Sequence, residues 1–510
     1  MKYVYGLVLF CSIILWSSCR TDFETVPNTG NLEFSRDTVF LDTIFTNIGS
    51  STYNLKVYNR SDDDITIPTI QLGDGESSQY RLNVDGLPGK TFNDITILAK
   101  DSIFVFVETT LDIDNLPGDG FEFLYEDQIQ FDTAGNQQNV ALITLVKDAI
   151  FLFPEDLGNG MFETLTLGGG EDAVEIEGFF LDPTELNFTN EKPYIIYGYA
   201  AVPPGEELII NPGARVHFHN NSGLLVANTA SIKANGVQSV DLDAMEGEII
   251  FEGDRLEPLF ANVPGQWGTI WCTAGSTNNE FSFTTIKNAA VGILMDSNDG
   301  DRTLTLRNTQ IYNSSNIGLL ARTGNVYGEN VVINNSGQSS LALSLGGSYT
   351  FNHCSFVNYW SNGFRSFPAV QIDNGSENET GVSSFPLTQA TFNNCIIYGS
   401  ENIELGLFPV DESTPFNLSL HNTLLRFNDT NNTFEGNPLY EFNNTVVLNI
   451  DPAFQDSGVN NFNIEQGISG AEGIGGSNTG GLVPIDLNGT NRATPPDAGA
   501  YESIEFPPEG

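Results

Sequence analysis

Short apolar runs at a regular spacing of about eight residues most restrict how this chain can fold. After Glu206 they are LII at 208–210, VHF at 216–218, LLV at 224–226 and SIKA at 231–234. Turn-forming pairs such as Pro212-Gly213 and Asn228-Thr229 separate them. Three such steps return a chain to its starting direction, as in a coil with three short strands per turn. We therefore expect an all-β chain whose main body is a parallel β-helix.

Five later phrases repeat one such turn at intervals of about 22 residues, with longer steps of about 41 and 28. Side chains alternate between the two faces of a strand, so the second and fourth members of each phrase share a face. The second members are Thr309, Val331, Cys354, Cys395 and Thr423, and the fourth members are Ile311, Ile333, Phe356, Ile397 and Leu425. Both columns are small or apolar, which predicts that they point into the core.

Asparagines recur two positions beyond the fourth column. They are Asn313, Asn335 and Asn358, with Asn288 one turn earlier. Stacked asparagines pass side-chain hydrogen bonds from one turn of a coil to the next and satisfy polar groups that would otherwise be buried unpaired. We predict a structural ladder at these four positions.

The 41-residue step between two of the repeated phrases holds an acidic insertion near Asp373. Such an insertion is either a loop on the binding side of the coil or sequence drift that an exposed loop tolerates.

Residues 31–148 carry a different pattern. Strand-length runs at 38–46, 53–58, 64–72 and 102–111 are separated by turn clusters such as Gly73-Asp74-Gly75. This spacing predicts an immunoglobulin-like β-sandwich that acts as a spacer or a binding module.

The N-terminus predicts export. Lys2 precedes an apolar run at 4–16 that is too short to span a bilayer and matches the core of a signal peptide. Ser17-Ser18-Cys19 resembles the lipobox of bacterial lipoproteins, although Trp16 stands where that family prefers Leu. The resemblance implies a lipid on Cys19 and attachment to a membrane; the alternative is a plain secretory signal with an incidental cysteine.

The residues that follow Cys19 carry a second resemblance. The stretch from Arg20 to Glu24 is similar to the surface-export signal of Bacteroidetes lipoproteins, which implies the outer membrane and the cell surface. The alternative is a solvated linker. The predicted boundaries are 1–18 for the signal peptide, 19–30 for the linker, 31–148 for the sandwich, 149–204 for a connecting β segment, 205–450 for the β-helix and 451–510 for a C-terminal cap.

Two further stretches carry a family resemblance. The phrase Pro264-Gly265-Gln266-Trp267-Gly268 resembles a recurring turn of right-handed parallel β-helix proteins of the pectin-lyase type. The ending Asp497-Ala498-Gly499-Ala500-Tyr501-Glu502 resembles the terminal element of bacterial surface β-helix proteins. We expect this ending to cap the coil, because an open solenoid end exposes strand edges. Arg492 and Asp497 are a candidate structural ion pair.

Composition excludes some function classes. Lys and Arg total 20 against 65 Asp and Glu, a net charge of −45. Such a surface repels the phosphates of nucleic acid, so we expect no nucleic-acid partner. Beyond the signal peptide and Cys19, the cysteines are Cys272, Cys354 and Cys395, with neither zinc spacing nor a disulfide framework. We expect them to be buried thiols.

Candidate chemistry is sparse. Asp296, Asp299 and Asp301 can supply oxygens to Ca²⁺, and Arg302, Arg307 and Arg322 stand nearby as bases for a polysaccharide lyase. A plain acidic turn is the favoured reading. His217 and His219 share a strand face and can hold a metal, but no third ligand is apparent, and outward-facing polar histidines are more common.

Two function hypotheses follow. The favoured one is a non-catalytic surface module that binds a glycan or protein partner, or displays a rigid rod. Its candidate surface is Tyr359, Trp360 and Phe364, for which core packing is the alternative. The other is a lyase or hydrolase that acts on acidic glycans in a groove of the β-helix.

Overall fold

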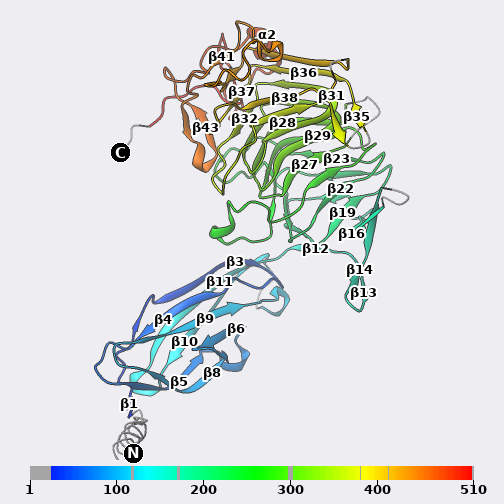
Figure 1. Ribbon diagram of the computed structural model, residues 1–510. Coiled ribbons are helices and arrows are strands. Elements are labelled where there is room, and N and C mark those ends of the chain that lie inside the picture. Colours follow the sequence, from blue (N-terminus) through cyan, green and yellow to red (C-terminus); the bar gives the residue numbers. More distant parts are fainter. Residues whose placement is uncertain are drawn as a thin grey trace, which may run out of the picture. The chain divides into compact units, whose positions relative to one another are not determined.

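The computed structural model describes residues 24–116, 120–168, 173–296, 302–378, 381–411 and 413–507. The predicted lipidation site Cys19 lies outside these residues. The chain forms two compact units, residues 1–148 and residues 149–510 (Figure 1). Within the described residues, no helix is both long and apolar enough to cross a membrane.

The first unit is an immunoglobulin-like β-sandwich, as the sequence predicted. One sheet contains β1 (Val26–Pro27), β5 (Ile65–Leu72), β10 (Glu122–Phe131), β11 (Gln138–Lys147), β3 (Thr38–Phe45) and β8 (Thr91–Ile97). The other contains β2 (Glu33–Phe34), β4 (Tyr53–Tyr58), β9 (Ser102–Thr109), β6 (Tyr80–Val84) and β7 (Leu87–Gly89). Alternation places Ile103, Val105 and Val107 in the core, whereas Phe104 and Phe106 point outward.

The second unit is a parallel β-helix with three strand faces, which confirms the predicted fold class. Face 1 contains β12 (Ile150–Leu152), β18 (Tyr194–Ile196), β21 (Arg215–Phe218), β24 (Ile249–Gly253), β30 (Val332–Ser336), β32 (Ser355–Asn358), β37 (Ile396–Gly399), β40 (Leu424–Leu425) and β41 (Val447–Leu448). Face 2 contains β16 (Val174–Phe180), β19 (Tyr199–Val202), β22 (Gly223–Val226), β25 (Ile270–Cys272), β27 (Val291–Met295), β33 (Val370–Asp373) and β38 (Leu405–Phe408). Face 3 contains β17 (Asn187–Phe188), β20 (Glu207–Ile210), β23 (Ser231–Asn235), β36 (Leu387–Asn393) and β39 (Phe416–His421).

Four long strands turn a corner and serve two faces. They are β26 (Asn279–Lys287) and β28 (Leu304–Ser314) between faces 3 and 1, and β29 (Ile317–Glu329) and β31 (Leu341–Asn352) between faces 2 and 3. The parallel sheet already includes β12 and β16 to β19, so the coil begins earlier than the predicted residue 205. The segment 149–204 is therefore part of the coil and not only a connection.

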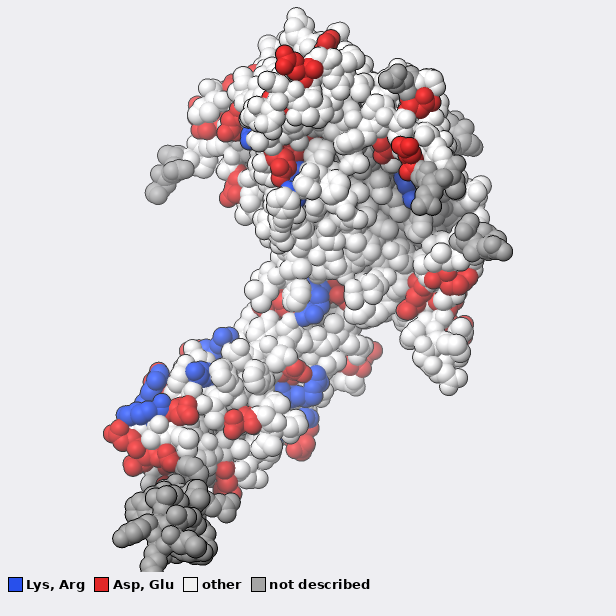
Figure 2. Space-filling view, viewed as in Figure 1, with Lys and Arg blue, Asp and Glu red and all other residues white. Residues whose placement is uncertain are grey.

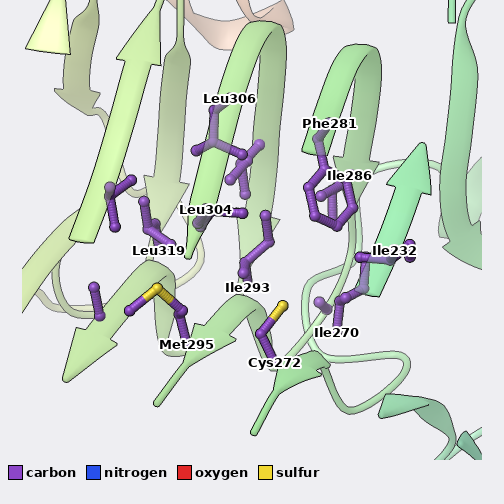
Figure 3. Close-up of a cluster of buried hydrophobic side chains, with 14 of the residues drawn as sticks. Ile232, Ile270, Cys272, Phe281, Ile286, Ile293, Met295, Leu304, Leu306 and Leu319 are labelled. Atoms are coloured by element: carbon purple, nitrogen blue, oxygen red, sulfur yellow. The ribbon is translucent and has the colours of Figure 1, made fainter. Parts of the chain in front are cut away.

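The core of the coil consists of inward columns that pair from strand to strand. Ile311 pairs with Ile333, and Ile333 pairs with Phe356, all without solvent exposure. On face 2, Ile270, Ile293 and Leu319 follow one another in the same way and point into the interior beside Cys272 and Met295 (Figure 3). The three described cysteines are buried free thiols, as predicted. Burial raises the pKa of Cys272 to about 12, so this thiol stays protonated at neutral pH.

The corner between faces 3 and 1 explains the first residue of each repeated phrase. Asn308, Asn330, His353, Asn394 and Asn422 all adopt the left-handed backbone conformation, with φ between 47° and 52°. Asparagine enters this region at lower cost than most residues, because its short polar side chain bonds locally. The recurring asparagine is therefore a backbone requirement of the corner.

A second column of asparagines forms the predicted ladder at the corner between faces 1 and 2. Asn313 Nδ2 donates to Asn288 Oδ1 at 3.2 Å, and Asn335 Nδ2 donates to Asn313 Oδ1 at 2.7 Å. Asn358 differs from the prediction, because its amide bonds the main chain of Ser336 and Gln338 instead of the Asn335 side chain. The ladder thus links three side chains and ends on main-chain groups.

The described part of the C-terminal segment, 451–507, packs along the outer side of face 1, whereas the sequence predicted that it would cap the end of the coil. It contains β42 (Phe454–Asp456), β43 (Asn461–Ile464) and α2 (Ser477–Leu482) (Figure 1). The reason is the apolar outer side of face 1, where Val332, Val357, Ile396 and Leu424 pack against Phe462, Ile464, Ala498 and Ala500. Side chains from the 434–446 loop, including Leu439, Tyr440 and Phe442, pack on the tube core near its last turns instead.

Candidate functional site

The outer side of face 2 carries a row of polar and aromatic side chains that run along the tube axis. We call this row, with its two flanking aromatic residues, the strip: Trp271, Asp296, Arg322, Ser344, Asp373 and Phe408. Each side chain points outward because its neighbours Cys272, Met295, Ala321, Leu343, Ile372 and Leu407 point into the core. At about 4.8 Å per strand, β25 to β38 cover roughly 24 Å.

Asp296 is the centre of the first half of the strip. Its carboxylate accepts a hydrogen bond from Trp271 Nε1 at 2.7 Å and another from Arg322 Nε at 2.6 Å. Arg322 also forms an ion pair with the same carboxylate. These contacts hold the indole ring and the guanidinium in fixed positions, and both side chains keep part of their surface in solvent.

Asp373 organises the second half of the strip. Its Oδ1 accepts from Ser344 Oγ at 3.1 Å, from the Leu345 amide at 2.8 Å and from the Gly375 amide at 3.2 Å. The acidic insertion begins here as the hairpin β34 (Gly375–Asn378) and β35 (Gly381–Ser384). The hairpin therefore leaves the coil directly beside the strip.

The two carboxylates of the strip are too far apart to act together in glycoside hydrolysis. The strands that carry Asp296 and Asp373 are separated by three strand steps, or roughly 14 Å. Retaining and inverting glycosidases need carboxyl groups about 5 to 9.5 Å apart. The strip thus offers aromatic and hydrogen-bonding groups without an acid and base pair.

The predicted calcium set is not assembled by the described residues. Asp299 and Asp301 lie outside them, and Asp296 is engaged by Arg322 and Trp271. The described part of the chain holds no group of three His, Cys, Asp or Glu side chains arranged for a metal ion.

The arginines predicted beside this set are also divided between faces. Arg302 and Arg307 lie against the Tyr327 ring on the outer side of face 3, where Arg307 also pairs with Glu329. Arg322 alone joins Asp296 on face 2. The described residues therefore bring one of the three predicted bases, Arg322, to Asp296 and place Arg302 and Arg307 on another face.

His217 on β21 and His219, which follows this strand, make different contacts. His217 is buried, bonds Gly253 O at 3.1 Å, and burial lowers its pKa. His219 bonds Asp254 Oδ2 at 2.7 Å and stacks on Tyr197, and the Asp254 carboxylate raises the pKa of His219. Among the described residues, no third His, Cys, Asp or Glu joins these histidines in a group that could hold a metal ion.

The predicted aromatic binding surface is not one surface. Tyr359 packs on Phe454 and Phe462 of the C-terminal segment, with ring centroids 6.3 and 6.5 Å apart, so it belongs to the packing on face 1. Trp360 is half-buried, and Phe364 is 91% exposed on the loop that follows. Trp271 and Phe408, which sequence reasoning missed, are aromatic side chains on the outer side of face 2.

The predicted pair of Arg492 with Asp497 is also corrected. Arg492 Nη1 lies 2.9 Å from Glu502 Oε1, and both side chains are buried. Asp497 instead accepts from the amides of Gly473 and Ser503. The terminal element is thus a buried network that fastens the C-terminal segment, with no exposed catalytic group.

Comparisons with known proteins concern the fold. The sequence matches no described protein family and no curated protein. The catalytic unit of a thermostable family 87 α-1,3-glucanase from Streptomyces thermodiastaticus matches over 73% of this chain and 72% of its own, at 11% identity and a TM-score of 0.20. The E. coli chaperone DraB matches over 24% of this chain and 58% of its own, at 15% identity and a TM-score of 0.17.

A third likeness is to a family 123 glycoside hydrolase from Clostridium perfringens. It covers 22% of this chain and 26% of that one, at 10% identity and a TM-score of 0.17. This chain therefore spans about a quarter of the hydrolase and less than two thirds of the chaperone. The chain is a large β-rich protein with an N-terminal immunoglobulin-like sandwich and a long parallel sheet.

Proposed function

We propose that this protein is a surface lipoprotein whose β-helix binds an extended glycan along the strip without cleaving it. The observation that carries the proposal is the fixed arrangement of Trp271, Asp296 and Arg322 on the outer side of face 2. An aromatic ring supplies a flat apolar surface, and the charged pair supplies donors and acceptors for hydroxyl groups. Carbohydrates present both kinds of surface to a binding site.

The shape of the strip supports a linear ligand. Its residues follow one another along the tube axis, with Trp271 at one end and Phe408, 50% exposed, at the other. Acidic side chains far outnumber basic ones in residues 149–510 (Figure 2), which disfavours polyanions on this unit. A neutral polysaccharide is therefore the ligand class that the strip fits best.

Absence of turnover is the second part of the proposal. It rests on the separation of Asp296 and Asp373 and on the use of Arg322 as a partner for Asp296. The Arg322 guanidinium donates to the Asp296 carboxylate, and a guanidinium has no acceptor atom with which to take up a substrate proton.

Attachment to the cell surface is the third part. It rests on the apolar run at 4–16 and on Ser17-Ser18-Cys19. Growth of the source cells with labelled palmitate tests this part. The protein is expected to carry label, and Cys19→Ala is expected to abolish the label and release the protein from membranes. Unlabelled wild-type protein contradicts the anchor and leaves the glycan proposal untouched.

Affinity electrophoresis in gels that contain neutral polysaccharides tests binding at the strip. At least one of a β-glucan, an α-glucan and a mannan is expected to retard the protein. Trp271→Ala and Arg322→Ala are each expected to weaken that retardation at least tenfold. Trp360→Ala serves as a control, since this half-buried tryptophan lies beside Gly337 at the corner between faces 1 and 2 and is not part of the strip. No retardation by any polymer, or equal loss in the control, contradicts the proposal.

A further inference from the structure

The outer side of the β4–β9–β6 sheet in the sandwich exposes two aromatic rings that lie side by side. Phe104 and Phe106 on β9 are 44% and 39% exposed, with ring centroids 6.0 Å apart and planes that differ by 17°. They alternate with the buried residues Ile103, Val105 and Val107, so the strand holds both rings on the outside. Two neighbouring exposed rings with nearly parallel planes form an apolar patch, and exposed apolar patches often mark binding sites.

Cationic side chains lie around these rings. Lys56 on β4 is directly opposite Phe104, and its Nζ is 5.2 Å from the Phe104 ring centroid and 5.3 Å from the Tyr58 ring centroid. Among the described residues, Lys56 Nζ has no carboxylate partner within ion-pair distance. Arg81 on β6 is exposed and bonds the Thr110 hydroxyl at 3.2 Å.

The protein has a net charge of −45, and basic side chains make up a larger share of the charged residues in the N-terminal unit than in the rest of the chain, although acidic ones outnumber them there as well (Figure 2). On this side of the sheet Glu108 lies opposite Arg81, so the positive charge is local to Lys56 and its neighbours. Arg60, which lies 4.2 Å from the Tyr58 ring, adds a guanidinium that is paired with Glu33. A free ammonium beside exposed rings is complementary to an anionic ligand that also has a flat apolar side.

Amide side chains complete the surface. Asn54 on β4 and Asn83 on β6 are the register partners of Phe106 on its two sides. Amides both donate and accept hydrogen bonds, which suits hydroxyl groups. Phe106 lies on the sheet between these two amides, whereas the apolar face of a segment that enters a bilayer carries no such polar neighbours. This surface therefore suits a glycan better than a membrane.

We infer that the outer side of the β4–β9–β6 sheet binds an anionic polysaccharide, with its sugar rings on Phe104 and Phe106 and a carboxylate or sulfate at Lys56. We call this surface the sandwich platform: Phe104, Phe106, Lys56, Arg81, Asn54 and Asn83. It is separate from the strip on the β-helix and does not depend on the function proposed for the strip.

Binding of the full chain to immobilised polygalacturonate and heparin, with neutral dextran beside them, tests this inference. At least one polyanion is expected to bind in low salt and more weakly as salt is raised, whereas any retention on dextran is expected to be independent of salt and of Phe104 and Phe106. Phe104→Ala and Phe106→Ala are each expected to lower the affinity at least tenfold. Lys56→Met is expected to lower the affinity and to flatten its dependence on salt.

Two controls make the result specific. Phe40→Ala removes a ring on β3 that is 49% exposed and lies in the other sheet, and it is expected to leave binding unchanged. Trp271→Ala is expected to leave it unchanged as well, which separates the platform from the strip. Failure of the wild-type protein to bind either polyanion, equal loss in Phe40→Ala, or platform-dependent binding to phosphatidylglycerol vesicles without polyanion binding overturns the inference.

Discussion

Arg492 and Glu502 form a buried ion pair, 2.9 Å apart, within the segment that covers face 1. Burial removes hydration from both charged groups, which lowers the pKa of Arg492 and raises the pKa of Glu502. The attraction between the two charges offsets this loss of hydration. Arg492 Nη2 also donates to Asn330 Oδ1 at 2.7 Å, which fastens the segment to a corner of the coil.

Removal of one partner of this pair leaves an uncompensated buried charge. Arg492→Met is expected to destabilise the β-helix unit by about 3 to 5 kcal/mol in urea unfolding. Arg60→Met serves as the control, because the Arg60 and Glu33 pair is exposed and its loss is expected to change stability little. Equal effects of the two substitutions contradict a fastening role for Arg492.

Gly499 lies in the terminal element at a position where both the backbone conformation and the surrounding space favour glycine. Its φ is +92°, and an added Cβ would lie 2.6 Å from Ile396 Cδ1 and 2.8 Å from Ser355 Oγ. Gly499→Ala is expected to cost about 1 to 2 kcal/mol for the backbone conformation and a further 1 to 3 kcal/mol for overpacking. Gly436→Ala has a similar φ of +74° with open space around it, so it isolates the backbone cost in thermal unfolding.

Asn313 tests the ladder. It is buried, donates to Asn288 and Asn262, and accepts from Asn335. Asn313→Ala leaves those partners unpaired and is expected to cost about 2 to 4 kcal/mol. Asn313→Asp is expected to be worse at neutral pH and to recover in acid, because an ionised carboxylate faces two oxygens that need a donor. If the stability of Asn313→Asp did not change with pH, the amide hydrogen bonds of Asn313 would not be what stabilises this position.

Glu248 predicts a pH dependence. It is buried, its carboxylate accepts from Thr285 Oγ1 at 3.3 Å, and burial raises its pKa. A carboxyl group with a raised folded-state pKa favours folding below its unfolded pKa, and that contribution is lost as pH rises through the folded pKa. Glu248→Gln is therefore expected to raise the Tm at neutral pH and to leave it unchanged in strong acid.

Glu246 is the opposite-sign control for Glu248. Backbone hydrogen bonds, the one from Val240 first, lower the pKa of Glu246. Glu246→Gln is therefore expected to lower the Tm at neutral pH, with the difference lost as pH falls through the folded pKa. Parallel pH profiles for the two variants contradict this account of Glu248.

The inward columns of the coil were predictable because their signal is repeated. Ile311, Ile333 and Phe356 occupy equivalent places in phrases of one length, and paired strands force equivalent places together. The sandwich strands were predictable for a similar reason, since turn clusters mark their ends. The recurring asparagines were visible too, although their left-handed backbone at the corners became clear only in the structure.

The site was less predictable, because it depends on which outward residues meet. Asp296 and Arg322 are 26 residues apart in sequence and adjacent only in the register of β27 and β29. Tyr359 looked like a surface aromatic because nothing near it in sequence reveals Phe454 and Phe462 as its partners. The C-terminal segment packs on face 1 because the outward side chains of that face are apolar. In a strand of four residues, the sequence does not show which apolar side chains face the core and which face a covering segment.

Parallel measurement of binding and turnover on the same polysaccharides tests the central claim most directly. The purified protein is incubated with neutral and acidic polymers, with and without Ca²⁺, and new reducing ends and ultraviolet-absorbing unsaturated ends are followed beside retention on each polymer. The account predicts that a neutral polymer is retained through Trp271 and Arg322 while its chain length stays constant. New chain ends that Arg322→Ala abolishes would contradict it and identify the strip as an active site.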